Sequence, residues 1–229
     1  MKWISDLIDL IFPRYCVVCG ELLSPQEKDI CVNCLNSLPK IEKIHLEEIE
    51  KTFWGKIEIE RATSFIYYHK QSPYNNIIHR LKYKNHPEVG ERFAYLAAKE
   101  IAVSGFFDGI DAIVPLPLSK KKERKRGYNQ CDYIAAGLSR ATGIPVIKGA
   151  VMRATSNETQ THKNRDERWK NVEGIFALAD ASLIEGKHIL LIDDILTTGA
   201  TLANCASAIQ QGCSCRTSIF TLAYTYNGI

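Results

Sequence analysis

The stretch from residue 189 to 201 places the strongest constraint on what this chain of 229 residues can fold into. Residues 189–192 form a short apolar run, which predicts a strand buried on both faces. Asp193 and Asp194 follow it, and a hydroxyl-rich loop then leads into an expected helix over 202–211. A loop and a helix N-terminus after a strand form an anion site, because free N–H groups and the helix dipole attract negative charge. The acids would repel such an anion, so we expect them to face sugar hydroxyls, a divalent cation or both.

The loop itself consists of small and hydroxyl-bearing residues, namely Thr197, Thr198, Gly199, Ala200 and Thr201. Gly199 lets the backbone approach a phosphate closely. The alternative is an ordinary strand–loop–helix turn in which a threonine caps the helix. The order of strand, paired acids and hydroxyl loop resembles the 5-phosphoribosyl-1-pyrophosphate (PRPP) motif of type I phosphoribosyltransferases. The resemblance implies that Asp193 and Asp194 hold the ribose hydroxyls at the catalytic centre, and that the five loop residues bind the 5′-phosphate.

Two Cys-x-x-Cys pairs lie near the start of the chain, at Cys16, Cys19, Cys31 and Cys34. Each pair places two sulfurs on one tight turn, so two pairs predict a tetrahedral structural zinc site with no open position. Two disulfides or redox-active dithiols are the alternatives, but no secretory signal indicates an oxidising compartment. The first twelve residues have apolar side chains at helical spacing and predict a short amphipathic helix that docks on the core or on a partner.

A strongly basic segment follows an expected strand at 112–114. It holds six bases and one acid between residues 120 and 126, and a loop in this place would sit at the ligand crevice of an open α/β sheet. The phosphoribosyltransferase resemblance implies that it binds pyrophosphate, through Lys120, Lys121, Arg124 and Arg126. A solvated basic turn and a contact for nucleic-acid phosphates are the other interpretations.

A long polar stretch between residues 153 and 172 predicts a lid that closes over the substrate. Arg165 and Arg168 would then complete the site. The overall net charge of +3 does not by itself indicate a nucleic-acid-binding protein, and no apolar run reaches the roughly 20 residues of a membrane span.

The order of motifs along the chain is similar to that of the ComF family of competence-associated proteins. The residues that carry this resemblance are 116–119 (Leu-Pro-Leu-Ser), 126–130 (Arg-Gly-Tyr-Asn-Gln), Arg153, 159–161 (Thr-Gln-Thr), Arg165, 171–172 (Asn-Val) and the PRPP motif, behind the four cysteines. The family resemblance implies a cytoplasmic bacterial protein that acts in DNA uptake and natural transformation, with other competence proteins as possible partners. It implies Mg²⁺-dependent phosphoribosyl transfer from PRPP to an acceptor that the motifs do not define. The alternatives are a non-catalytic PRPP or nucleotide sensor, a single-stranded-DNA-binding accessory protein, or a docking adaptor.

The predicted fold class is therefore α/β, with a type I phosphoribosyltransferase-like parallel sheet flanked by helices and a small four-cysteine zinc element. We expect residues 1–45 to form the N-terminal helix and zinc element. Residues 46–229 would form the main domain, with an accessory hood at 46–108 and a core at 109–229. Within it, helices are expected at 75–84, 91–103 and 128–142, strands at 62–68, 146–147, 176–178 and 217–223, and a charged connector at 36–60.

Overall fold

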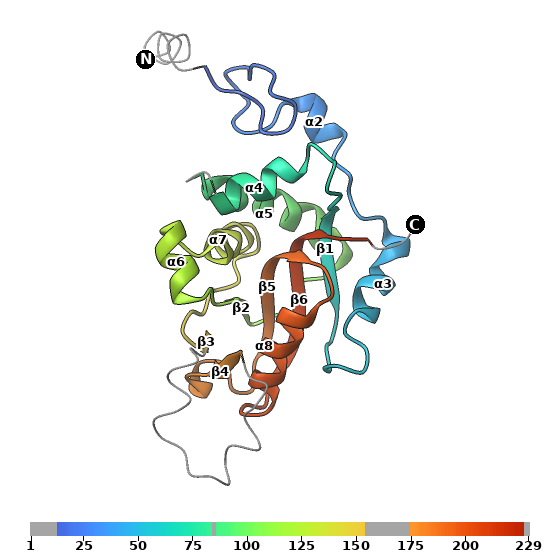
Figure 1. Cartoon of the computed structure of the whole chain (residues 1–229). Coiled ribbons are helices and arrows are strands. Elements are labelled where there is room, and N and C mark those ends of the chain that lie inside the picture. The colour runs from blue at the N-terminus through green and yellow to red at the C-terminus, as the bar shows by residue number, and fades with distance from the viewer. Residues whose placement is uncertain (1–12, 84–85, 154–174, 227–229) are drawn as a thin grey trace.

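A four-stranded parallel sheet with the order β1-β6-β5-β2 forms the centre of the molecule (Figure 1). The computed structural model describes residues 13–83, 86–153 and 175–226. The strands are β1 (Ala62–Tyr67), β2 (Ala112–Pro115), β3 (Val151–Arg153), β4 (Phe176–Leu178), β5 (His188–Leu196) and β6 (Arg216–Tyr224). The helices are α2 (Val32–Asn36), α3 (Leu46–Lys51), α4 (Asn75–Tyr83), α5 (Glu88–Ile101), α6 (Lys120–Arg126), α7 (Gln130–Thr142) and α8 (Ala200–Gln210), with short 3₁₀ turns at Lys43–His45, Ala102–Ser104 and Ala181–Leu183.

Strand β5 is buried on both faces, as its apolar run predicts. Leu190 and Ile192 pack into a cluster with α4, α5 and α7, whereas Ile189 and Leu191 pack into a second cluster with α3 and α8. This alternation follows from the two-residue period of a strand. Helices therefore cover both faces of the sheet, and the predicted α/β class is confirmed, together with the four-cysteine element.

Helices α5 and α7 pack closely because of one glycine. A Cβ atom at Gly137 would lie 2.1 Å from the backbone oxygen of Glu91 and 2.9 Å from the Cβ of Ala94. Only a residue without a side chain permits this approach. The close packing fixes α7, whose first turn faces the carboxyl end of the sheet.

Strands β2 and β5 differ in length, and this difference shapes the edge of the sheet next to the two acids. β2 pairs with β5 only as far as Pro115 opposite Ile192, whereas β5 continues beside β6 to Leu196 opposite Tyr224. The expectation that β5 ends before Asp193 was therefore wrong: both acids lie within the strand. Because β2 stops short, no strand of the described residues lies beside the last part of β5 on that side, and a cavity forms there.

Two other local expectations were wrong. The basic segment is a helix, α6, rather than a loop: Ser119 caps its start and Gly127 ends it with φ of +83°. Lysine, arginine and glutamate are good helix formers, which explains this outcome. The predicted strand at 146–147 is reduced to a single bridge between Val146 and Ile113. The predicted strand at 176–178 is confirmed as β4, which pairs with β3 in a separate antiparallel ribbon.

The charged connector also contributes to the core. It contains helix α3, and Ile49 on this helix and Phe53 just after it are both fully buried. The four-cysteine element packs on the opposite face, where Val17 and Leu23 belong to the cluster of α4, α5 and α7. A boundary at residue 45 stays a prediction, and the expected helix over the first twelve residues lies outside the described part. Within the described ranges, no helix combines the length and apolar character that a bilayer crossing requires.

Candidate functional site

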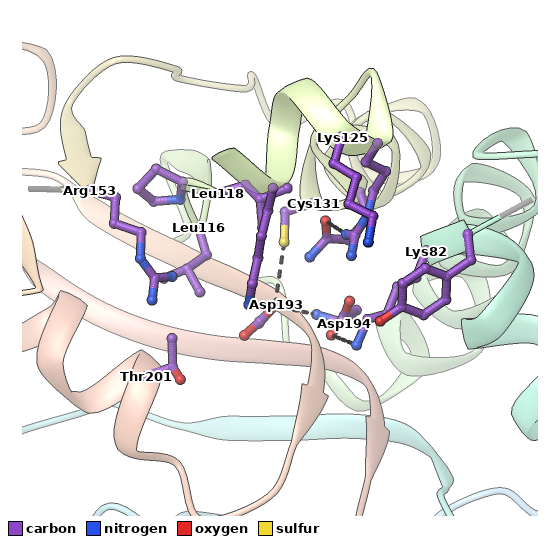
Figure 2. Close-up of a pocket in the computed structure, with 14 residues that line it drawn as sticks. Lys82, Leu116, Leu118, Lys125, Cys131, Arg153, Asp193, Asp194 and Thr201 are labelled. Carbon is purple, nitrogen blue, oxygen red and sulfur yellow. Dashed lines mark hydrogen bonds and ion pairs between the residues drawn. The ribbon is translucent and has the colours of Figure 1, made fainter. Parts of the chain in front are cut away.

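A cavity of about 510 Å³ opens at the carboxyl end of the sheet, beside the extended part of β5 (Figure 2). Asp193 and Asp194 supply its two carboxylates. Positive side chains from three different elements also line it, namely Lys82, Lys122, Lys125, Arg126 and Arg153. Five cations against two acids give the cavity an excess of positive charge, which suits a multiply charged anion.

The two acids have different environments because successive side chains of a strand leave opposite faces. Asp193 Oδ1 accepts a hydrogen bond from the backbone N–H of Asp194 at 2.8 Å and from the Cys131 thiol at 3.5 Å. Asp194 is buried and forms an ion pair with Lys82, at 3.0 Å between Oδ1 and Nζ. A neutral thiol thus accompanies the first acid and a cation the second.

Burial and the neighbouring charge of Asp194 raise the pKa of Asp193 to about 7. The pKa of an aspartate in the unfolded chain is about 3.9. The folded state therefore keeps a proton that the unfolded state has lost between these two values. Stability falls as the pH rises through this range and levels off above it.

We expect Asp193→Asn to stabilise the fold at pH 8, by about 1–2 kcal/mol after allowance for the exposure of this side chain to the cavity. The gain should shrink as the pH falls from 7 to 4, because the wild-type acid becomes neutral there. Urea unfolding at several pH values measures it. Glu58→Gln, an exposed change of the same kind, should show no such trend, and an Asn variant that is no more stable than the wild type at pH 8 would contradict the expectation.

The loop after β5 has the backbone that a phosphate site requires. Gly199 adopts φ of +72°, and a Cβ atom there would lie 2.8 Å from Cγ2 of Thr52. Helix α8 begins at the next residue without a side-chain cap from Gly199. A small pocket between the loop and the helix is also lined by Asp193, and Thr201 lines the main cavity. Loop and acids therefore adjoin, as the sequence predicts.

The structure places the predicted basic residues on different sides of α6. Arg126 lines the cavity, whereas Lys120, Lys121 and Arg124 do not. Lys122 and Lys125 line it instead, because residues three and four apart share one face of a helix. Sequence reasoning missed these two residues because it treated the segment as a loop; a helical interpretation would have grouped them with Arg126.

Other cavity residues come from elements whose sequence gave no sign of a site. Lys82 lies in the last turn of α4, Cys131 lies in the first turn of α7, and Arg153 ends β3 with its guanidinium 5.1 Å from the ring centre of Phe176. Arg153 was noted only as part of a family motif. Arg165 and Arg168, the predicted lid residues, lie outside the described part of the chain.

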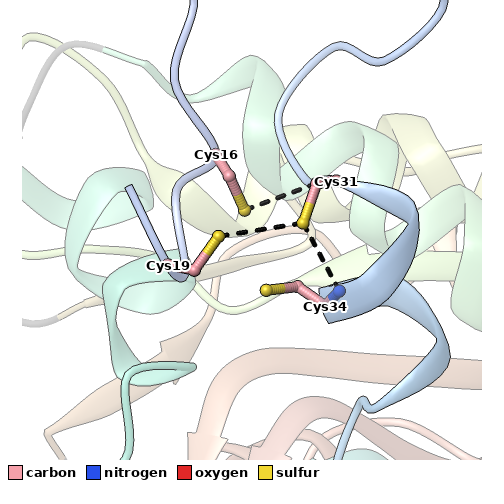
Figure 3. A group of neighbouring side chains, drawn as sticks. All are labelled: Cys16, Cys19, Cys31 and Cys34. Atoms are coloured by element: carbon pink, nitrogen blue, oxygen red, sulfur yellow. Dashed lines mark hydrogen bonds between the residues drawn. The ribbon is translucent and has the colours of Figure 1, made fainter. Parts of the chain in front are cut away.

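The four cysteines form a second site, in which their side chains lie close together (Figure 3). Their sulfurs all lie within 4.8 Å of one another, and Cys19 and Cys31 are 3.7 Å apart. Zn–S bonds of about 2.3 Å in a tetrahedron place sulfurs about 3.8 Å apart, so the set fits a structural zinc. Although burial opposes it, N–H groups of Cys19 and Cys31 lower the pKa of the Cys16 thiol to about 7. All four are free thiols, which leaves no disulfide in this element.

Two contacts join this element to the hood. Arg92 of α5 forms a paired interaction with Asp29, with Nη2 at 2.7 Å from Oδ1. The Tyr74 hydroxyl, just before α4, donates to the backbone oxygen of Cys34 at 3.1 Å. The four-cysteine element is therefore fixed to α5 and to the start of α4, and α4 carries Lys82 into the cavity lining.

Known proteins share these features. Residues 7–45 match the family model of the double zinc ribbon domain. Competence protein F of Haemophilus influenzae is 28% identical over 204 residues, which cover 87% of this chain and 80% of that protein. A solved glutamine PRPP amidotransferase from B. subtilis covers 61% of this chain and 30% of its own, with 19% identity and a TM-score of 0.41. This last likeness is partial, and the fold described above stands on the strand order of this chain.

A second competence protein extends the match over nearly the whole chain. Competence protein ComFC of Bacillus subtilis is 30% identical over 221 residues, which cover 88% of this chain and 86% of that protein. Identity at this level over this length shows that the chain belongs to the ComF family of competence proteins.

Proposed function

We propose that this protein binds PRPP together with Mg²⁺ and transfers its phosphoribosyl group to an acceptor during bacterial DNA uptake. The observation that carries the proposal is the arrangement of one cavity. A glycine-hinged threonine loop at a helix N-terminus adjoins a carboxylate pair, and cations lie beyond the pair. PRPP has the same sequence of groups: a 5′-phosphate, a ribose diol and a pyrophosphate.

Each part of the site would act on one part of this ligand. The loop from Thr197 to Thr201 would bind the 5′-phosphate through backbone N–H groups and hydroxyls. Asp193 and Asp194 would accept hydrogen bonds from the ribose hydroxyls and so orient the ring. Loss of pyrophosphate leaves oxocarbenium character at C1 and negative charge on the departing oxygens. Lys125 and Arg126 would stabilise that charge, which is how preorganised sites lower such barriers.

Mg²⁺ would be held mainly by ribose and pyrophosphate oxygens of the ligand, and it would neutralise part of the leaving group's charge. The carboxylate-bearing cavity fits an oxygen-ligated cation. The chain's own contribution is to position the sugar and the pyrophosphate relative to the acceptor. The proposed location is the cytoplasm, where PRPP and incoming single-stranded DNA would both be available.

The test is calorimetric titration of zinc-loaded, full-length protein with PRPP in the presence of Mg²⁺. We expect saturable binding with one site per chain. An acceptor screen that detects pyrophosphate release then separates a transferase from a PRPP sensor. Absence of binding by well-folded protein would reject the proposal.

One observation favours a second function. Lys121 and Arg124 are exposed on α6 and do not line the cavity, so they are available to a larger polyanion such as single-stranded DNA. The competence proteins to which this chain is similar make DNA a reasonable partner.

We expect the affinity for a labelled single-stranded oligonucleotide to fall steeply with salt, because phosphate contacts release counterions. Replacing both Lys121 and Arg124 by Gln should reduce the slope of log affinity against log salt by about 1–2, at roughly 0.7 per lost contact. The control exchanges Lys70 and Lys99, which are exposed and lie outside α6. An unchanged slope would exclude this face of α6 as the contact.

A further inference from the structure

Helix α4 brings one cation, Lys82, into the cavity from the hood. The helix is held at both ends: the Tyr74 hydroxyl donates to the Cys34 backbone oxygen at 3.1 Å, and the Tyr128 hydroxyl donates to the Leu81 backbone oxygen at 2.7 Å. Leu81 is itself fully buried. The backbone next to Lys82 is therefore fixed, and its flexible side chain is the part that can respond to a ligand.

In the structure the Lys82 ammonium group covers Asp194. The Asp194 side chain is only 5% exposed, with Oδ1 paired to Lys82 and Oδ2 buried without a hydrogen-bond partner among the described residues. A ribose hydroxyl can reach this carboxylate only if the ammonium group moves away. A lysine that leaves its counter-ion in a poorly solvated site needs another anion, because an unpaired buried charge is costly.

The geometry indicates which anion replaces the carboxylate. Figure 2 shows Thr201 and Arg153 on one side of the acid pair and Lys82 on the other, near Lys125. The guanidinium of Arg126 lies 5.4 Å from the ring centre of Tyr83, the residue that follows Lys82. Lys82 therefore belongs to the cationic end of the cavity, away from the threonine loop.

We propose that Lys82 is a ligand-binding residue that exchanges partners: it pairs with Asp194 in the empty site and with the pyrophosphate oxygens of PRPP in the filled one. This inference rests on the proposed function, since it assigns the 5′-phosphate to the loop. It adds a pyrophosphate contact from the hood, far in sequence from α6 and from the PRPP motif. Movement of the Lys82 side chain would couple release of Asp194 to arrival of the ligand's charged end.

The experiment compares three probes on zinc-loaded, full-length protein: PRPP with Mg²⁺, pyrophosphate with Mg²⁺, and ribose 5-phosphate, which lacks the pyrophosphate. For Lys82→Met we expect PRPP and pyrophosphate to bind about 10- to 100-fold more weakly, because a hydrogen bond to a charged group is lost. Ribose 5-phosphate should bind within about twofold of wild type or more tightly, because a competitor for Asp194 is gone. Arg80→Met, the same exchange on the same helix but outside the cavity lining, is the matched control.

Equal weakening of all three probes would overturn the proposal, since Lys82 would then only support Asp194. Unchanged binding of all three would overturn it as well. If wild-type protein binds no PRPP, the proposed function itself fails, and that result is distinct from the other two. Should Lys82→Met not fold, as judged by zinc content and thermal unfolding, Lys82→Gln is tested with the same probes, because its amide can still donate to Asp194 without carrying a charge.

Discussion

Removal of zinc is expected to unfold the four-cysteine element while β5 and β6 stay folded. Residues 14–37 bury few apolar side chains of their own, and a segment this short cannot offset its chain entropy without the metal. Structural zinc contributes on the order of 10 kcal/mol in such elements. The sheet has a second cluster, with α3 and α8, that does not include the zinc element.

Two measurements check this result. Metal analysis under reducing conditions should find one zinc per chain in wild-type protein and none in Cys16→Ser/Cys31→Ser. Hydrogen exchange should then show loss of protection across residues 14–37 and partial loss in α4 and α5, which contact the element through Tyr74 and Arg92. Cys215→Ser, outside the cluster, should retain full zinc. If zinc-free protein keeps full hydrogen-exchange protection in this segment, the four-cysteine element does not need the metal to fold.

Asp193→Asn/Asp194→Asn is expected to weaken PRPP binding by at least about 100-fold, because two charge-assisted hydrogen bonds to ribose hydroxyls are lost together. Lys82 also loses its counter-ion, but the fold should survive, since an amide fits the same space. The single change at Asp193 should even stabilise the protein at pH 8. Binding would thus fall while stability is retained, which separates a functional effect from unfolding.

Calorimetry with PRPP and Mg²⁺ measures this prediction, and urea unfolding confirms that the variant is folded. Glu58→Gln/Glu60→Gln is the matched control: it also removes two acids, but near the amino end of β1 rather than beside the cavity. Its affinity for PRPP should equal that of the wild type. If the Asp193/Asp194 variant keeps the wild-type affinity for PRPP, these residues do not bind the ribose hydroxyls.

Features encoded within short segments could be predicted from the sequence. The zinc site depends on two Cys-x-x-Cys turns, each local, and the four sulfurs meet as expected. The anion loop depends on contiguous residues after a buried strand, so Gly199 and Asp193 adjoin as the motif implies. The parallel sheet with helices on both faces follows from the apolar run of β5, which needs cover on each side.

Features that depend on pairing or on chain segments far apart were decided by the tertiary structure alone. β5 extends past its acids because β6 continues to pair with it after β2 has stopped at Pro115, and no local pattern shows where a neighbouring strand ends. Which face of α6 lines the cavity depends on how the helix packs against the rest of the chain. This packing places Lys122 and Lys125, rather than Lys121, in the cavity lining. Lys82 lies more than a hundred residues from Asp194 in the chain. The two side chains pair only because packing of α4 between the zinc element and Tyr128 carries the Lys82 ammonium group to that carboxylate.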